Sequence, residues 1–98
     1  MTLQSFTAET FRGRQGETFR LTVDDSNGFD TELIEISEAE AGPGASRAPF
    51  SLVFRGPREI VLPQRIYALE HAELGRFEIF LVPIGPDEVG MRYEAVFA

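Results

Sequence analysis

Short runs of alternating apolar and polar residues, separated by turns that contain glycine or proline, constrain the fold of this chain most strongly. Such runs lie at residues 19–36, 50–55, 65–70 and 91–97. Alternation with a period of two is typical of strands with one buried face. The chain is therefore predicted to be mainly β, a small antiparallel barrel or sandwich of roughly six to seven strands with at most one short N-terminal helix.

The first strong local signal is a hairpin over residues 19–36. Asn27-Gly28 is a dipeptide typical of two-residue hairpin turns, in which both residues have positive φ. A turn at this position places Arg20 opposite Glu35, as an ion pair on the polar face. The same register pairs Phe19 with Ile36 and Leu21 with Ile34 on the apolar face. Leu33 then falls on the polar face, opposite Thr22.

The N-terminal segment predicts a single helical turn. Thr7 has the side chain of a helix N-cap, and Glu9 places a negative charge in the first turn. Gly13 and Gly16 are expected to stop the helix.

Residues 76–84 stand out because the run from Ile79 to Ile84 is apolar at every position. A strand of this kind is expected to be central, with both faces covered. A turn at residues 71–75 precedes it, and Gly75 is expected to take the left-handed conformation there.

Residues 39–49 contain alanine, glycine, serine and proline but no large apolar side chain. This composition predicts an exposed, flexible loop. The chain contains no internal repeat and no second hydrophobic block, so residues 1–98 are expected to form a single globular β domain.

The chain lacks several of the side chains that enzymes use as nucleophiles, bases or soft metal ligands. The chain has no cysteine, lysine or tryptophan and one histidine, His71. Glu70 and Glu73 flank this histidine, but adjacent residues of a strand point to opposite faces and a structural zinc site needs about four ligands. The preferred interpretation is a turn histidine that hydrogen-bonds locally. We expect no enzymatic activity, no cofactor and no bound metal.

Charge is acidic overall and uneven along the chain. Nine arginines and 16 acids give a net charge of −7, which repels nucleic acid and anionic membrane surfaces. Residues 24–40 include acids but no base, whereas arginines outnumber acids in residues 41–69. One interpretation is two solvated surfaces, and the other is a pair of patches that steers salt-sensitive binding to a protein partner or a second copy. The candidate interaction residues are Asp24, Asp25, Asp30, Glu32, Arg47, Arg55, Arg58 and Arg65.

Three motifs carry a resemblance to a known family: the turn LEHAELG, the strand end FLVPIG and the terminus YEAVF. The chain resembles a family of small bacterial proteins described only as a domain of unknown function. The resemblance implies no catalytic residues, and it suggests an accessory or structural role near phage-tail-like proteins. Ala72 replaces the proline expected in the LEHxxLG turn.

Two classes of function fit these observations. The first is a non-enzymatic interaction or structural module that acts through sheet edges and charged surfaces. The alternative is a small-molecule or carbohydrate-binding β domain, with or without weak hydrolytic activity, that uses carboxylates and Tyr67 or Tyr93 at a barrel mouth. A concave pocket with convergent polar groups favours the alternative, and a filled interior favours the first. The first residues lack a basic segment followed by an apolar run, which predicts a cytoplasmic protein or one exported without a standard signal.

Overall fold

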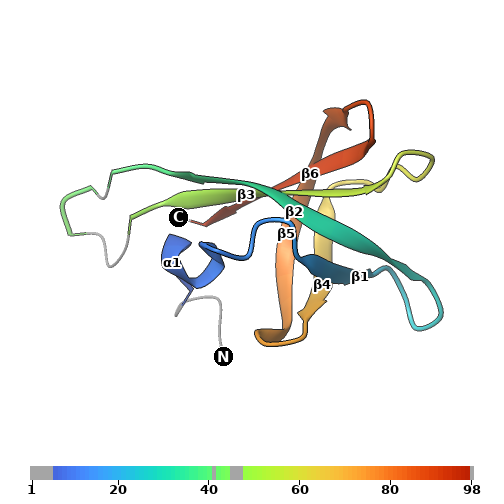
Figure 1. Ribbon diagram of the computed structural model, residues 1–98, viewed down its shortest axis with the longest axis horizontal. Helices are drawn as coiled ribbons and strands as arrows, with labels where there is room; N and C mark the ends of the chain where they lie inside the picture. Colours follow the sequence, from blue (N-terminus) through green and yellow to red (C-terminus); the bar gives the residue numbers. More distant parts are fainter. Residues whose placement is uncertain (1–5, 41, 45–47, 98) are drawn as a thin grey trace.

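A computed structural model of the chain describes residues 6–40, 42–44 and 48–97. A short helix precedes six strands, which form a closed antiparallel barrel in the order β1-β2-β3-β6-β5-β4 (Figure 1). The mainly β prediction is confirmed, and its barrel alternative is the correct one. The elements are α1 (Ala8–Phe11), β1 (Thr18–Thr22), β2 (Gly28–Glu38), β3 (Phe50–Pro57), β4 (Arg65–His71), β5 (Gly75–Pro86) and β6 (Gly90–Phe97).

Closure of the ring fixes which strands face one another across the barrel. β2 and β5 are separated by two other strands in either direction around the ring, so they lie on opposite sides. Figure 1 shows β2 crossing in front of β5. Their outward side chains therefore point in opposite directions.

The interior of the barrel is filled by the inward-facing residues of the strands. Burying a large apolar side chain contributes about 1.5–3 kcal/mol, so this core is the main source of stability. The largest fully buried side chains on the strands are Phe19, Leu21, Leu33, Leu52, Phe54, Leu69, Leu81 and Tyr93.

The helix α1 covers the end of the barrel where β3 begins and β6 ends. Phe6 and Phe11 are fully buried there, and the Phe11 ring lies 5.9 Å from that of Phe97. The predicted helical turn is confirmed, with Thr7 at its N-cap position and the Thr7 N–H donating to Thr10 Oγ1 at 3.0 Å. Gly13 follows the helix with a φ of 87°.

The opposite end of the barrel is covered by residues 58–64, which connect β3 to β4. The hydroxyl of Tyr93 accepts the Leu62 N–H and donates to the Ile60 carbonyl, both at 3.1 Å. The hydroxyl of Tyr67 donates to the Pro63 carbonyl at 2.6 Å. Two core tyrosines thus hold this segment across the barrel end, and the side chain of Leu62, within the segment, is buried.

The predicted hairpin is present, but its predicted register is wrong. Arg20 lies opposite Asp30 instead of Glu35. The connecting turn is centred on Asp24 to Asn27, because the Asp24 carboxylate accepts the N–H groups of Ser26 and Asn27, each at 2.9 Å. This local capping replaces the expected turn at Asn27-Gly28.

Gly28 is a strand residue of β2 and has no positive φ. A Cβ atom at Gly28 would lie 2.5 Å from the Leu21 carbonyl oxygen, so close strand pairing explains the glycine. The register shift moves Leu33 into the core and leaves Ile36 only half-buried. An odd shift in pairing exchanges the two faces of a strand.

Two further predictions concern the connections. Gly75 has a φ of 78°, which confirms the left-handed turn before β5. The predicted loop at residues 39–49 includes residues 41 and 45–47, which lie outside the described part, while the Ala39 N–H donates to the Pro49 carbonyl at 2.8 Å. Among the described residues, no helix is long and apolar enough to cross a membrane.

Candidate interaction surface

The predicted acidic residues lie on β2 and on the turn before it. Asp24 caps this turn, and hydrogen bonds from the Asn27 side chain and the Ser26 backbone lower the pKa of its carboxyl. Asp25 is exposed at the same turn. The Asp30 carboxylate pairs with Arg20 Nη1 at 3.4 Å. Glu32, further along β2, pairs with an arginine of β3.

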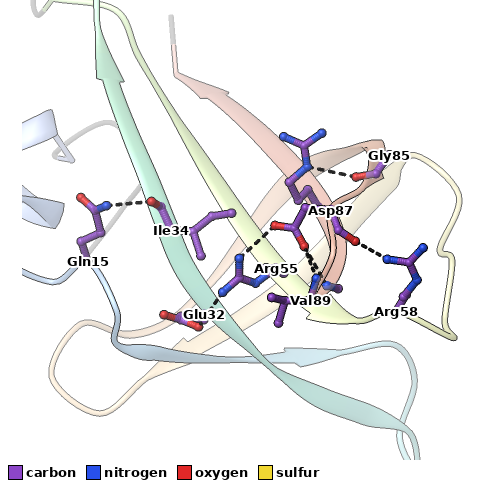
Figure 2. A network of polar contacts seen from close by, with 10 residues as sticks. Gln15, Glu32, Ile34, Arg55, Arg58, Gly85, Asp87 and Val89 are labelled. Atoms are coloured by element: carbon purple, nitrogen blue, oxygen red, sulfur yellow. Dashed lines mark hydrogen bonds and ion pairs between the residues drawn. The ribbon is translucent and has the colours of Figure 1, made fainter.

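Arg55 forms the centre of a charged network on β3 (Figure 2). Its Nη1 atom lies 2.9 Å from Asp87 Oδ2, and its Nη2 atom lies 3.3 Å from Glu32 Oε1. The hydrogen bond to Asp87 is the main cause that raises the pKa of the Arg55 guanidinium.

Asp87 caps the turn between β5 and β6. Its Oδ1 atom accepts the N–H groups of Val89 and Gly90, each at 2.8 Å. The Gly90 hydrogen bond, followed by the Arg55 side chain, lowers the pKa of the Asp87 carboxyl to about 2. A carboxylate with such a low pKa is poorly suited to exchange protons near neutral pH. The network is therefore suited to holding the hairpin, and sequence reasoning missed Asp87.

The predicted arginines are mostly occupied by contacts within the chain. Arg58 Nη1 donates to the Asp87 backbone carbonyl, and the Arg65 guanidinium lies over the Tyr67 ring at 5.1 Å. Arg47 lies outside the described residues. Because Glu32 and Arg55 are cross-strand neighbours, the acidic and basic segments adjoin at this point. A role for these residues in binding stays a prediction.

His71 is a buried turn histidine with both ring nitrogens in contact. Its Nδ1 atom accepts the N–H groups of Glu73 at 3.0 Å and Leu74 at 3.2 Å. The predicted local hydrogen bonding is therefore confirmed. Its Nε2 atom lies 2.7 Å from Glu17 Oε1, and because Nδ1 is an acceptor, Nε2 carries the proton.

Glu17, His71 and Glu73 could together hold a metal ion, since their ligand atoms lie within 4.8 Å of one another. The sequence did not indicate Glu17, which reaches His71 from the segment before β1. Arg14 Nη1 lies 2.7 Å from Glu73 Oε1 and 3.7 Å from Glu17 Oε1. A guanidinium thus already supplies the positive charge that these carboxylates attract.

An uncovered apolar surface lies on the outside of β4 and β5. Ile66 and Phe80 are cross-strand neighbours with exposed fractions of 61% and 51%. Val82 follows Phe80 on the same face and is half-buried, and Ile84 is 37% exposed. We call the surface of these four residues the β4–β5 face.

This surface corrects the expectation that β5 is covered on both sides. Ile79 and Leu81 point inward and are buried, as expected for the core face. The outward residues lack a second layer in the described part of the chain, because a barrel encloses only one face of each strand. Of the seven exposed large apolar residues in the described part, six lie between Ile60 and Val89, and the seventh is Val96.

The β4–β5 face also differs in charge from the opposite side of the barrel. β4 contains one arginine and one glutamate, and so does β5, so each strand has no net charge apart from His71. The sequence of β2 is GFDTELIEISE, with four acids and no base. The acidic side of the molecule therefore lies opposite its exposed apolar side.

The fold and this surface define a class of protein: a small six-stranded antiparallel barrel with a filled core, closed ends and an apolar outer face. Within that class, residues 6–97 match the family model described as a domain of unknown function, DUF6916, and the chain belongs to this family. The predicted resemblance to such a family is confirmed at this level. No curated protein and no solved structure matches the chain.

Proposed function

We propose that the domain is a non-enzymatic protein-interaction module and that it binds through the β4–β5 face. The observation that carries this proposal is the exposure of Phe80 and Ile66 as a cross-strand pair. Contiguous exposed apolar side chains are a feature of protein-binding surfaces, because covering them removes apolar area from water. The arrangement extends the sequence-based expectation, which placed binding at charged residues and sheet edges.

The filled interior supports an outer binding surface. The inward side chains occupy the barrel, and α1 and residues 58–64 cover its two ends. A small-molecule barrel needs a cavity with convergent polar groups. One open depression of about 480 Å³ includes His71, Arg20 and Glu70 in its lining, but both ring nitrogens of His71 are already bonded. The alternative of a carbohydrate-binding or hydrolytic domain is therefore less well supported.

The net charge of −7 disfavours nucleic acid and anionic membrane as partners. A cytoplasmic location and a structural role beside phage-tail-like proteins belong to this proposal as its expected setting. The proposal itself concerns only a protein partner on the β4–β5 face.

The absence of cysteine allows a site-specific test. In a Phe80→Cys variant the single thiol can carry a benzophenone photo-crosslinker at the centre of the face. A Val96→Cys variant is the matched control, since Val96 is 68% exposed on β6 and lies outside the face. Both labelled proteins are irradiated alone and in extract of the native host, and adducts are identified by mass spectrometry.

We expect discrete protein adducts from position 80 that are absent or much weaker at position 96. An adduct with another copy of the chain counts as a protein adduct. Equal labelling from both positions, or none from position 80, would contradict the proposal.

A further inference from the structure

We infer that the partner on the β4–β5 face is a second copy of this chain, packed face to face about a two-fold axis. This inference rests on the proposed function and names the occupant of the same surface. A two-fold contact uses the same patch on both copies, so the patch must be complementary to itself.

The first observation is that the outward side of β5 is apolar and exposed. Its residues from Ile79 to Ile84 form an apolar run, but only the inward ones are covered by the barrel. Two sheets that pack face to face lie about 10 Å apart and bury one layer of side chains from each. A second copy would place Phe80 and Ile66 in such a layer. The second copy would thus bury the outward apolar residues of β5 that the barrel leaves exposed.

The second observation is that the acidic strand β2 lies far from the β4–β5 face. Each copy has a net charge of −7, so two copies repel one another unless their acidic sides are kept apart. The acids of β2 lie across the barrel from β5. Contact through the β4–β5 face therefore places the two β2 strands on the outer sides of the pair. No other strand is as far from β2 around the ring.

The rim of the face is compatible with itself. The charged residues on the outer surface around the face come in three of each sign: Arg20, Arg76 and Arg92, with Glu70, Glu78 and Glu94. A face of zero net charge meets a copy of itself without net repulsion. A strongly basic partner, by contrast, would find more complementary charge on β2.

The face is small for a stable dimer, since standard interfaces bury about 800 Å² on each partner. We therefore expect a weak dimer, with a dissociation constant of about 10 μM to 1 mM. Its affinity should be maintained or increased when salt rises from about 0.05 M to about 0.5 M, because salt screens repulsion between the two copies. This reverses the salt dependence expected for charge-driven binding.

Sedimentation equilibrium of the purified protein over that concentration and salt range tests the inference. Phe80→Arg should raise the dissociation constant at least about tenfold, because it places a charge at the centre of the contact. Ile66→Arg is the second variant, and Val96→Arg is the matched control that should leave the constant unchanged. Circular dichroism and thermal melting establish that each variant is folded.

A wild-type protein that stays monomeric up to about 1 mM would overturn the inference. A dimer that tolerates both Phe80→Arg and Ile66→Arg would overturn it as well. If the protein is monomeric but position 80 crosslinks to a different protein, self-association fails while the proposed function stands. If neither dimer nor adduct appears, both fail.

Discussion

The carboxylate of Asp87 lies 2.9 Å from the guanidinium of Arg55, and this ion pair joins the β5–β6 turn to β3. Asp87 also accepts two backbone N–H groups of its own turn. One side chain thus shapes a hairpin and attaches it to the neighbouring strand. The charge of that side chain should make the hairpin sensitive to acid.

The first prediction concerns the pH dependence of this contact. The pKa of the Asp87 carboxyl is about 2 in the folded protein against an ordinary value of 3.8, so its ionised form stabilises the fold. That contribution is fully present above about pH 4 and is lost as the pH falls through about 2. Asp87→Asn keeps an acceptor for the turn but loses the charge.

Urea unfolding of wild type and Asp87→Asn should therefore show the largest stability difference above about pH 4 and a shrinking one towards pH 2. Asp25→Asn, at the exposed β1–β2 turn, is the control. A difference that is constant over this range would show that the charge of Asp87 has no stabilising role.

The second prediction concerns the cover of one barrel end. Tyr93→Phe removes the hydroxyl that pairs with Leu62 and Ile60, and leaves the N–H of the buried Leu62 without this partner. We expect a loss of about 1–3 kcal/mol in the free energy of unfolding. Tyr67→Phe removes one bond to the exposed Pro63 and should cost less. Urea unfolding measures both, and equal losses would contradict the importance given to Tyr93.

The third prediction concerns the close approach of β3 and β6. A Cβ atom at Gly90 would lie 2.1 Å from the Gly56 carbonyl oxygen, which is backbone and cannot rotate away. Gly90→Ala should therefore destabilise the protein by about 1–3 kcal/mol. Gly42→Ala, where nothing lies within 4 Å, is the control. Calorimetry showing similar melting temperatures for the two variants would rule out this packing constraint.

The fourth prediction concerns metal binding at Glu17, His71 and Glu73. Because Arg14 lies against both carboxylates and His71 Nδ1 is occupied, we expect no stoichiometric transition metal in the purified protein. Elemental analysis measures the content. Thermal melting with added Zn²⁺ and with EDTA should give the same midpoint. A rise with Zn²⁺ that disappears in His71→Gln would refute the prediction.

Local signals in the sequence predicted much of the fold, and contacts between distant segments accounted for what was missed. Thr7 and Gly75 act within a few residues, so their roles were readable. The hairpin register could not be predicted locally, because Asp24 and Asn27-Gly28 each fit a turn. Packing of the core determines which of the two turns forms. The partner of His71 is Glu17, 54 residues away, and no local pattern indicates such a contact.

The candidate surface was visible in the sequence but was misinterpreted. The apolar run of β5 predicts a strand correctly, but its prediction of cover on both faces is wrong. A pattern of residue types records that a face is apolar, and it does not record what covers it. For Asp87, the spacing to Gly90 in the segment DEVG was a usable turn signal.

The contact between Phe11 of α1 and Phe97 of β6 also has a kinetic consequence. It joins segments near opposite ends of the sequence, so nearly the whole chain must be available before the core can close. Barrels governed by such distant pairings fold in about milliseconds to seconds, more slowly than helical bundles of similar size. During synthesis on the ribosome, Phe11 can therefore pack against Phe97 only after β6 has been synthesised.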